Sequence, residues 1–177
     1  MTKNVVVIGK PGAGKTSLIH KLTGLSKELL PTVGPEVYAL KRDDVVVHVW
    51  DTPGQDKYSS ISAGLVASAA LVLACSEDGT WVETPRGTPE LRVRTKDDLN
   101  RPWFSADLAT SALTGAGVRS LFDAIFCLVS APPVVGGSGC CGWGCSAVAT
   151  HTTVDQYRLD LITNAPQTHG PKKTLGI

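Results

Sequence analysis

The chain has 177 residues, which is enough for one domain with a substantial core but too few for two domains of ordinary size. Its 17 basic and 16 acidic residues give a net charge of +1, so overall charge provides no basis for binding nucleic acid or an anionic membrane. Five cysteines, an odd number in an ordinary globular composition, favour reduced thiols inside a cell over a disulfide framework.

A glycine-rich motif stands near the start of the chain. Residues 9–16 read GKPGAGKT and match the pattern G-x-x-x-x-G-K-[ST] without a mismatch. The apolar run at 5–8 predicts a buried strand before this loop, and apolar spacing from Leu18 to Leu25 predicts a helix after it. In such a loop the backbone amides surround a polyphosphate, Lys15 approaches the β- and γ-phosphates, and Thr16 offers a hydroxyl to Mg²⁺. The motif therefore predicts binding of a nucleoside triphosphate.

The next segments predict a loop, a hairpin and a second phosphate-side motif. Thr32 lies in a loop after the first helix, and strand-like runs at 37–41 and 45–50 flank a turn at 42–44. The second run leads into Asp51-Thr52-Pro53-Gly54-Gln55. A carboxylate at the end of a strand beside a phosphate loop is suited to hold Mg²⁺, usually through a water.

The apolar stretch at 63–75 is too short to span a bilayer. Residues 91–94 predict a short strand, which leads into Thr95-Lys96-Asp97-Asp98. Thr110-Ser111-Ala112-Leu113 precedes a predicted helix with an apolar face between Val118 and Phe126.

These motifs in this order, from residue 4 to about residue 130, resemble the small GTPases of the Ras superfamily. The part from Pro31 to Lys57 is most similar to the Arf-like branch, whereas Thr95 to Leu99 is more similar to the Rho branch, so the branch stays open. The resemblance implies a three-layer α/β P-loop NTPase domain with about six strands, mostly parallel with one antiparallel strand. It implies GTP and GDP as ligands and Mg²⁺ as cofactor. It further implies exchange proteins, GTPase-activating proteins and effectors as partners.

The resemblance also assigns roles to single residues. Gln55 would be catalytic because it would orient the attacking water. Asp98 would accept hydrogen bonds from the guanine base, Lys96 would lay its stem along that base, and Thr95 stands where the family more often has Asn. The expected guanine-binding residues are Thr95, Lys96, Asp98, Ser111, Ala112 and Leu113. The expected phosphate-binding residues are Gly9, Lys10, Pro11, Gly12, Ala13, Gly14, Lys15, Thr16, Ser17 and Gly54, and the expected metal ligands are Thr16, Thr32 and Asp51.

Several features depart from this family pattern. Glycines and prolines between Cys75 and Leu91 exclude the long helix that the family places there, and the chain between Asp98 and Ser111 is too short for a full helix and strand. One face of the sheet should therefore lose its cover, unless Trp81, Trp103 and Phe104 shield it. Otherwise it should expose apolar surface. Pro11 replaces a common glycine and could alter how Gln55 approaches the γ-phosphate. Cys75 and Cys127 lie in apolar runs and are expected to be buried packing residues.

We expect a GTP-binding domain at 1–130 and a flexible, disordered tail at 131–177. Lipidation of Cys140, Cys141 or Cys145, a zinc site and an altered reading frame are alternatives for the tail. We expect a cytoplasmic protein, with peripheral attachment to intracellular membranes left open and no nucleic-acid partner. The main hypothesis is a GTP/GDP switch with slow hydrolysis, in trafficking or signalling. The alternative is a non-hydrolysing pseudo-GTPase that serves as an interaction module.

Overall fold

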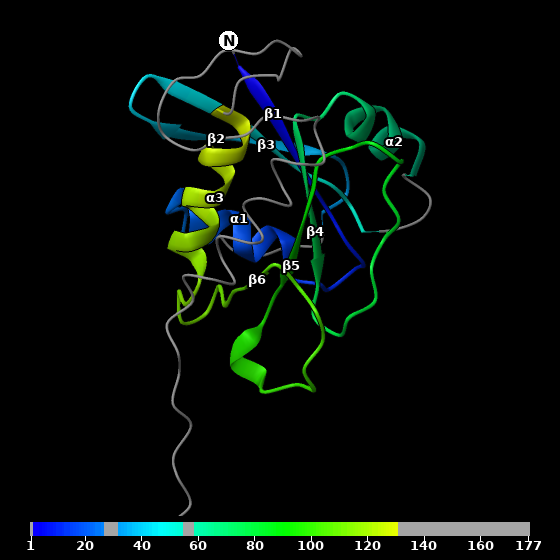
Figure 1. Ribbon diagram of the computed structural model, residues 1–177, viewed down its shortest axis with the longest axis vertical. Coiled ribbons are helices and arrows are strands. Elements are labelled where there is room, and N and C mark those ends of the chain that lie inside the picture. Colours follow the sequence, from blue (N-terminus) through cyan, green and yellow to red (C-terminus); the bar gives the residue numbers. More distant parts are fainter. Residues whose placement is uncertain (1, 27–31, 55–58, 131–177) are drawn as a thin grey trace, which may run out of the picture.

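The computed structural model describes residues 2–26, 32–54 and 59–130, with the side chains of 59–62 left out. Within these ranges the chain forms one sheet with helices on both of its faces (Figure 1). The elements, in chain order, are β1 (Lys3–Ile8), α1 (Lys15–Thr23), β2 (Glu36–Arg42), β3 (Val45–Asp51), α2 (Ser59–Ala67), β4 (Leu71–Ser76), β5 (Glu90–Arg94), the 3₁₀ turn η2 (Asp97–Leu99), β6 (Leu108–Ala109) and α3 (Val118–Ser130).

The six strands lie in the order β2-β3-β1-β4-β5-β6. All neighbouring strands run parallel except β2 and β3, which form an antiparallel hairpin through the turn at Asp43 and Asp44. Asp43 adopts a left-handed conformation with φ 52°, which Asp tolerates better than most residues. The predicted α/β fold with one antiparallel strand is confirmed, and so is the predicted hairpin.

Alternation along the strands divides the core into two layers. Val5 and Val7 of β1 face α1 and α3, whereas Val6 and Ile8 face the other side, where α2 lies. Figure 1 shows α1 and α3 on one side of the sheet and α2 on the opposite side. The predicted apolar face of the last helix is confirmed, since Leu121, Ala124, Ile125, Phe126 and Val129 of α3 are all buried.

Two predictions need correction, one about the end of the first helix and one about the burial of a cysteine. Leu25 does not continue the first helix, because Gly24 ends α1 in a left-handed conformation with φ 70° and leaves Leu25 49% exposed. Cys127 is exposed, since it points away from the buried face of α3, whereas Cys75 in β4 is buried as predicted. Burial raises the pKa of the Cys75 thiol to about 12, so this thiol is not reactive near neutral pH.

The side of the sheet over β4 and β5 has no long helix among the described residues, as the sequence predicts. Trp81, from the connection between β4 and β5, packs against the core layer that includes Val6 and Ile8. Its ring lies edge-on to the ring of Phe104, with 5.8 Å between the ring centroids. Trp103 does not cover the sheet, because this residue is 81% exposed. The prediction is therefore wrong for Trp103.

The strand β5 itself presents no apolar side chain to this side of the sheet. Leu91 and Val93 of β5 are buried on the α1 side, and the alternate positions Glu90, Arg92 and Arg94 face the side without a long helix. The Arg92 guanidinium lies 5.4 Å from the Trp81 ring centroid, and the Arg94 guanidinium lies 5.7 Å from that of Phe104. Arginine side chains that lie over aromatic rings therefore cover this side of the sheet in place of a helix. Such contacts remain favourable beside water.

Candidate functional site

The loop of residues 9–14 joins β1 to the first turn of α1. Gly14 stands at the helix N-cap in a left-handed conformation with φ 79°, and its carbonyl accepts from the Leu18 amide at 2.9 Å. A residue with a side chain would be strained at this φ, so glycine allows the loop to enter the helix. The free amides at a helix N-terminus and the helix dipole favour a bound phosphate at this end of α1.

Lys15, the first residue of α1, is buried against this loop. Its side chain is buried, and Nζ donates to the Gly9 carbonyl at 2.9 Å and to the Lys10 carbonyl at 3.0 Å. An ammonium group has three N–H donors, so one further donor remains for a phosphate oxygen. Burial lowers the pKa of Lys15, and the nearby Asp51 carboxylate opposes this effect. The negative charge of a bound phosphate would favour the charged form of Lys15 and so oppose the effect of burial on its pKa.

Three expected metal ligands meet beside Lys15. Thr16 Oγ1 donates to Asp51 Oδ2 at 2.6 Å, Thr32 Oγ1 donates to the same oxygen at 3.2 Å, and the two hydroxyls are 3.0 Å apart. Asp51 ends β3, Thr16 lies in the first turn of α1 and Thr32 lies before β2, so three separate segments supply the set. Burial raises the pKa of Asp51, while the two hydroxyls and Lys15 lower it.

The residues present fit a magnesium ion whose shell is completed by phosphate and water. Asp51 Oδ1 is buried and has no hydrogen-bond partner within the described structure. No group of three His, Cys, Asp or Glu side chains occurs in the described ranges, so no all-protein metal cage is present there. Mg²⁺ commonly takes only one or two protein ligands and keeps water or phosphate oxygens for the rest.

Gly54 lies directly against the phosphate loop. A Cβ atom placed on it would be 2.4 Å from the Pro11 nitrogen and 2.8 Å from Lys15 Nζ, so no larger residue fits without movement. The expected contact between the Gly54 amide and a phosphate stays a prediction. Gln55, the expected catalytic residue, lies outside the described residues.

The expected guanine-binding residues surround a pocket beside α1. The pocket has a volume of about 650 Å³, and its wall includes Thr95, Lys96, Asp98, Ala112 and Leu113 on one side and Ser17 and Lys21 of α1 on the other. Ser111 does not line this pocket directly; its hydroxyl donates to Asp98 Oδ1 and so holds that carboxylate. Ser111 contacts only the Oδ1 atom of this carboxylate and not Oδ2.

Thr95 connects the guanine motif to the phosphate loop. Its side chain is buried, and Oγ1 lies 2.6 Å from the Ala13 carbonyl and 3.2 Å from the Ser76 carbonyl. A hydroxyl has one proton, which the closer Ala13 carbonyl accepts. Thr95 therefore tethers the end of β5 to the loop of residues 9–14.

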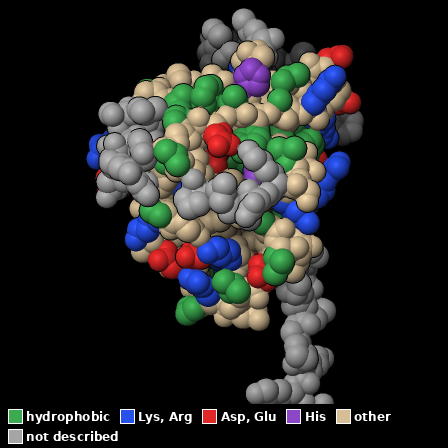
Figure 2. Space-filling view, turned by 180° about the vertical axis from the view of Figure 1, so that it is seen from behind, with side chains coloured by type: hydrophobic (Ala, Val, Ile, Leu, Met, Phe, Trp, Pro, Cys, Tyr) green, Lys and Arg blue, Asp and Glu red, His purple; other side chains and the backbone are tan. Residues whose placement is uncertain are grey.

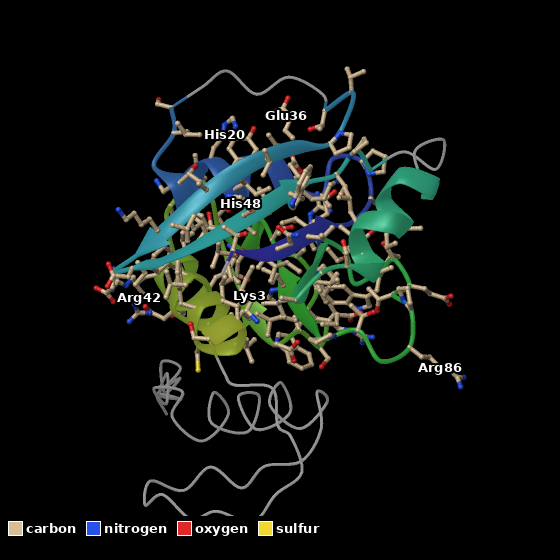
Figure 3. The ribbon with its side chains drawn as sticks, turned by 90° about the horizontal axis from the view of Figure 1, so that it is seen from above. Lys3, His20, Glu36, Arg42, His48 and Arg86 are labelled. Carbon is tan, nitrogen blue, oxygen red and sulfur yellow. The ribbon has the colours of Figure 1, made fainter. Side chains whose placement is uncertain are left out.

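His20 also lines this pocket, although none of the sequence motifs includes it. The Tyr38 hydroxyl donates to Glu36 Oε2 at 2.7 Å, so at the 3.2 Å contact with Tyr38 the His20 Nε2 is the donor. Figure 3 shows His20 on α1 close to β2, the strand that carries Glu36. Burial and Glu36 together raise the pKa of Tyr38 to about 12. A chain of hydrogen bonds thus joins the pocket wall to the edge strand.

Taken together, a glycine-rich loop between a strand and a helix, a buried lysine above it and a carboxylate with two hydroxyls define a P-loop nucleotide-binding domain. The comparison with protein families narrows this class. The family model described as Ras of Complex, the Roc domain of DAPkinase, matches residues 4–92, which is half of the chain. The chain therefore belongs to the Roc family of Ras-like GTPase domains.

Individual relatives support the same superfamily. The chain is 32% identical over 142 residues to the tRNA modification GTPase MnmE of Acidiphilium cryptum, covering 72% of this chain and 33% of the relative. It is 33% identical over 104 residues to the Ras-related protein RIC2 of Oryza sativa, covering 54% and 48%. It is 32% identical over 97 residues to the ADP-ribosylation factor-like protein 8c of Arabidopsis thaliana, covering 53% of each. The chain thus spans between a third and about half of these relatives, and the similarity supports a GTP-binding domain.

Proposed function

We propose that this domain is a guanine-nucleotide switch that binds GTP and GDP with Mg²⁺ and hydrolyses GTP slowly. The observation that carries the proposal is the meeting of Thr16, Thr32 and Asp51 within hydrogen-bond distance of one another. Thr32 lies outside the regular elements, just before β2, yet its hydroxyl contacts both Thr16 and Asp51. Such a loop can be held while the triphosphate is bound and released after hydrolysis, which is the physical basis of a switch.

The chain's own residues account for binding. Lys15 donates its remaining N–H to the phosphates, and the amides of the loop and of the first turn of α1 complete the cradle. Asp98 accepts hydrogen bonds from the N1–H and exocyclic amine of guanine, and adenine lacks this pair of donors. Mg²⁺, when bound to Thr16, Thr32 and Asp51, supplies charge that offsets the negative charge of the phosphates.

Hydrolysis depends on Gln55, which we propose holds the attacking water in line with the γ-phosphate. Gly54, the residue before it in the sequence, packs closely against Pro11 and Lys15. We further propose that fast turnover depends on an arginine supplied by an activating protein, which would stabilise the charge of the transition state.

One observation favours the alternative of a non-hydrolysing interaction module. Pro11 has no amide N–H, and its nitrogen contacts the position of a Gly54 Cβ, immediately before Gln55. The domain could then bind GTP while Gln55 is held away from the in-line position. The two candidates share nucleotide binding and differ in turnover.

The cellular role is part of the proposal. Similarity to Ras-related and Arf-like proteins supports signalling or vesicle trafficking, with exchange proteins, activating proteins and effectors as partners. We propose a cytoplasmic location, and peripheral attachment to intracellular membranes stays an open alternative. No helix within the described ranges has both the length and the apolar character needed to cross a bilayer.

Competition binding tests the central claim. Fluorescent GDP is loaded onto the full chain with Mg²⁺ and displaced by GTP, GDP, ATP or ADP. We expect the guanine nucleotides to compete at concentrations at least about 1,000-fold lower than the adenine nucleotides, since an unpaired carboxylate rejects adenine. Equal displacement by ATP and GTP would end the proposal.

A further inference from the structure

The segment that carries Asp98 has an unusual backbone. We name residues 95–101 the reader segment, because it includes the proposed guanine-reading carboxylate. The 3₁₀ turn at Asp97–Leu99 is flanked by Lys96 with φ 54° and Asn100 with φ 47°, both in the left-handed region. Residues with side chains rarely adopt this conformation, so contacts from outside the segment must help to hold it.

Glu77, the residue after β4, contacts both ends of this turn. Its Oε2 lies 2.6 Å from Lys96 Nζ and 3.6 Å from Arg101 Nη2, and its side chain is 23% exposed. Lys96 precedes the turn and Arg101 follows it, so one carboxylate joins the two flanks of the segment. In the lower part of the molecule, where the reader segment lies in Figure 1, Figure 2 shows acidic and basic side chains interleaved.

The contact also sets the path of the Lys96 side chain. The Lys96 Cε atom lies 3.6 Å from the position of a Cβ on Gly14, so the stem runs along the end of the phosphate loop before Nζ reaches Glu77. This course places the stem at the wall of the 650 Å³ pocket, where a base would stack on it. Without an anion at Glu77, the ammonium group would turn toward water and the stem would leave the wall.

We propose that Glu77 is a positioning residue for guanine recognition. Its carboxylate holds Lys96 and Arg101 so that the reader segment is already in its binding conformation before the nucleotide arrives. The inference rests on the proposed function, since it assumes that Asp98 reads guanine. Both contacts of Glu77 are to the reader segment, so we expect its effect on recognition of the base and not of the triphosphate.

The test compares two nucleotides in one variant. Glu77→Gln retains the size of the side chain and removes its charge. We expect GDP to dissociate about tenfold faster, because the variant loses both ion pairs, and each partly exposed ion pair contributes up to about fivefold. ADP does not use the reader carboxylate, so its affinity should stay within about twofold of the wild type. The GDP-to-ADP affinity ratio should therefore fall about tenfold.

Two further variants make the result specific. Glu83→Gln is the same chemical change at an exposed position of the same connection, and it should leave the ratio unchanged. Arg101→Met removes the more distant partner and leaves the Lys96 contact, so it should lower the ratio by about threefold. The difference between wild type and Glu77→Gln should also shrink between about 50 mM and about 1 M NaCl, because salt screens a partly exposed ion pair.

The outcomes separate this inference from the proposed function. If the wild type prefers GDP but Glu77→Gln keeps the same ratio, or loses GDP and ADP affinity equally, the inference is overturned and the proposed function stands. If the wild type itself shows no preference for GDP over ADP, both are overturned. Should Glu77→Gln fail to fold, an unchanged ratio in Arg101→Met together with a wild-type ratio that does not respond to salt would overturn the inference.

Discussion

The charged residues of the phosphate site are buried before any ligand arrives. Lys15 and Asp51 are both buried, burial lowers the pKa of the lysine, and burial raises the pKa of the aspartate. Each residue offsets only part of the other's desolvation, because burying a charge costs more than one imperfect partner returns. The site is therefore organised for ligands that bring both negative phosphate and positive metal charge.

Asp51→Asn should reveal this cost through pH. A carboxyl whose pKa is raised on folding contributes stability below its ordinary pKa of 3.8, and this contribution is lost as pH rises through the folded value. Asparagine has no such dependence. In nucleotide-free protein, Asp51→Asn should therefore gain free energy of unfolding over the wild type as pH rises from about 4 to about 7, measured by denaturant titration at several pH values. A wild-type advantage that grows over this range would contradict the argument.

Asp98→Asn tests the base contact at the same scale. An amide presents an N–H where the carboxylate presents an acceptor, so GDP affinity should fall about 100-fold or more while affinity for xanthosine diphosphate rises. Competition against fluorescent GDP measures both changes. Asp123→Asn, the same substitution on α3, serves as the control and should leave both affinities unchanged. Parallel losses for the guanine and xanthine nucleotides would show that Asp98 supports the fold and does not read the base.

At the scale of elements, this domain departs from the expected family pattern in the connections around β4 and β5. The β2–β3 hairpin keeps its link to the helical side, where Arg42 Nη1 lies 3.1 Å from Asp123 Oδ1 of α3 (Figure 3). On the opposite side the long connection from β4 to β5 covers the sheet with Trp81 and extends Arg86 outward into solvent (Figure 3). Trp81 thus takes over part of the burial that a helix would supply.

Trp81→Ala should lower the free energy of unfolding by about 2 kcal/mol. The estimate is below the range for a fully buried tryptophan because Trp81 is only partly buried. Trp103→Ala is a matched control, since its side chain is 81% exposed, and it should change stability by less than about 0.5 kcal/mol. Urea denaturation of both variants gives the comparison. Equal effects of the two substitutions would show that Trp81 does not replace a helix as a cover of the sheet.

At the scale of the whole molecule, turnover decides between the switch and the interaction module. Without an arginine supplied by a partner, we expect a single-turnover rate of about 10⁻⁴ to 10⁻² per second. Gln55→Leu should reduce this rate further and leave GTP affinity unchanged, because the glutamine holds water and not the ground-state nucleotide. Release of phosphate from preloaded GTP measures both proteins. Wild-type hydrolysis no faster than that of Gln55→Leu would favour the non-hydrolysing module.

The local parts of the fold were open to prediction because neighbouring residues encode them. The phosphate loop is contiguous from Gly9 to Thr16, the hairpin turn lies between two short strands, and α3 shows its apolar face in its own spacing. Two proposed metal ligands could be named for the same reason. Thr16 ends the contiguous glycine-rich motif, and Asp51 ends the apolar run that forms β3. The role of Gln55 and the character of residues 131–177 remain predictions, because they lie outside the described residues.

Only the tertiary structure decided which distant residues meet. The Thr95 contact with Ala13 joins residues 82 positions apart, and it exists because β1 and β5 lie on either side of β4 in the sheet. The ion pairs of Glu77 likewise depend on neighbouring β4 and β5 ending at the same edge. Sequence periodicity tells which residues share a face, but it does not tell which face a connection will cover. For that reason Trp81 and Trp103 looked equivalent in the sequence, and only the path of the folded chain placed one against the sheet and the other in water.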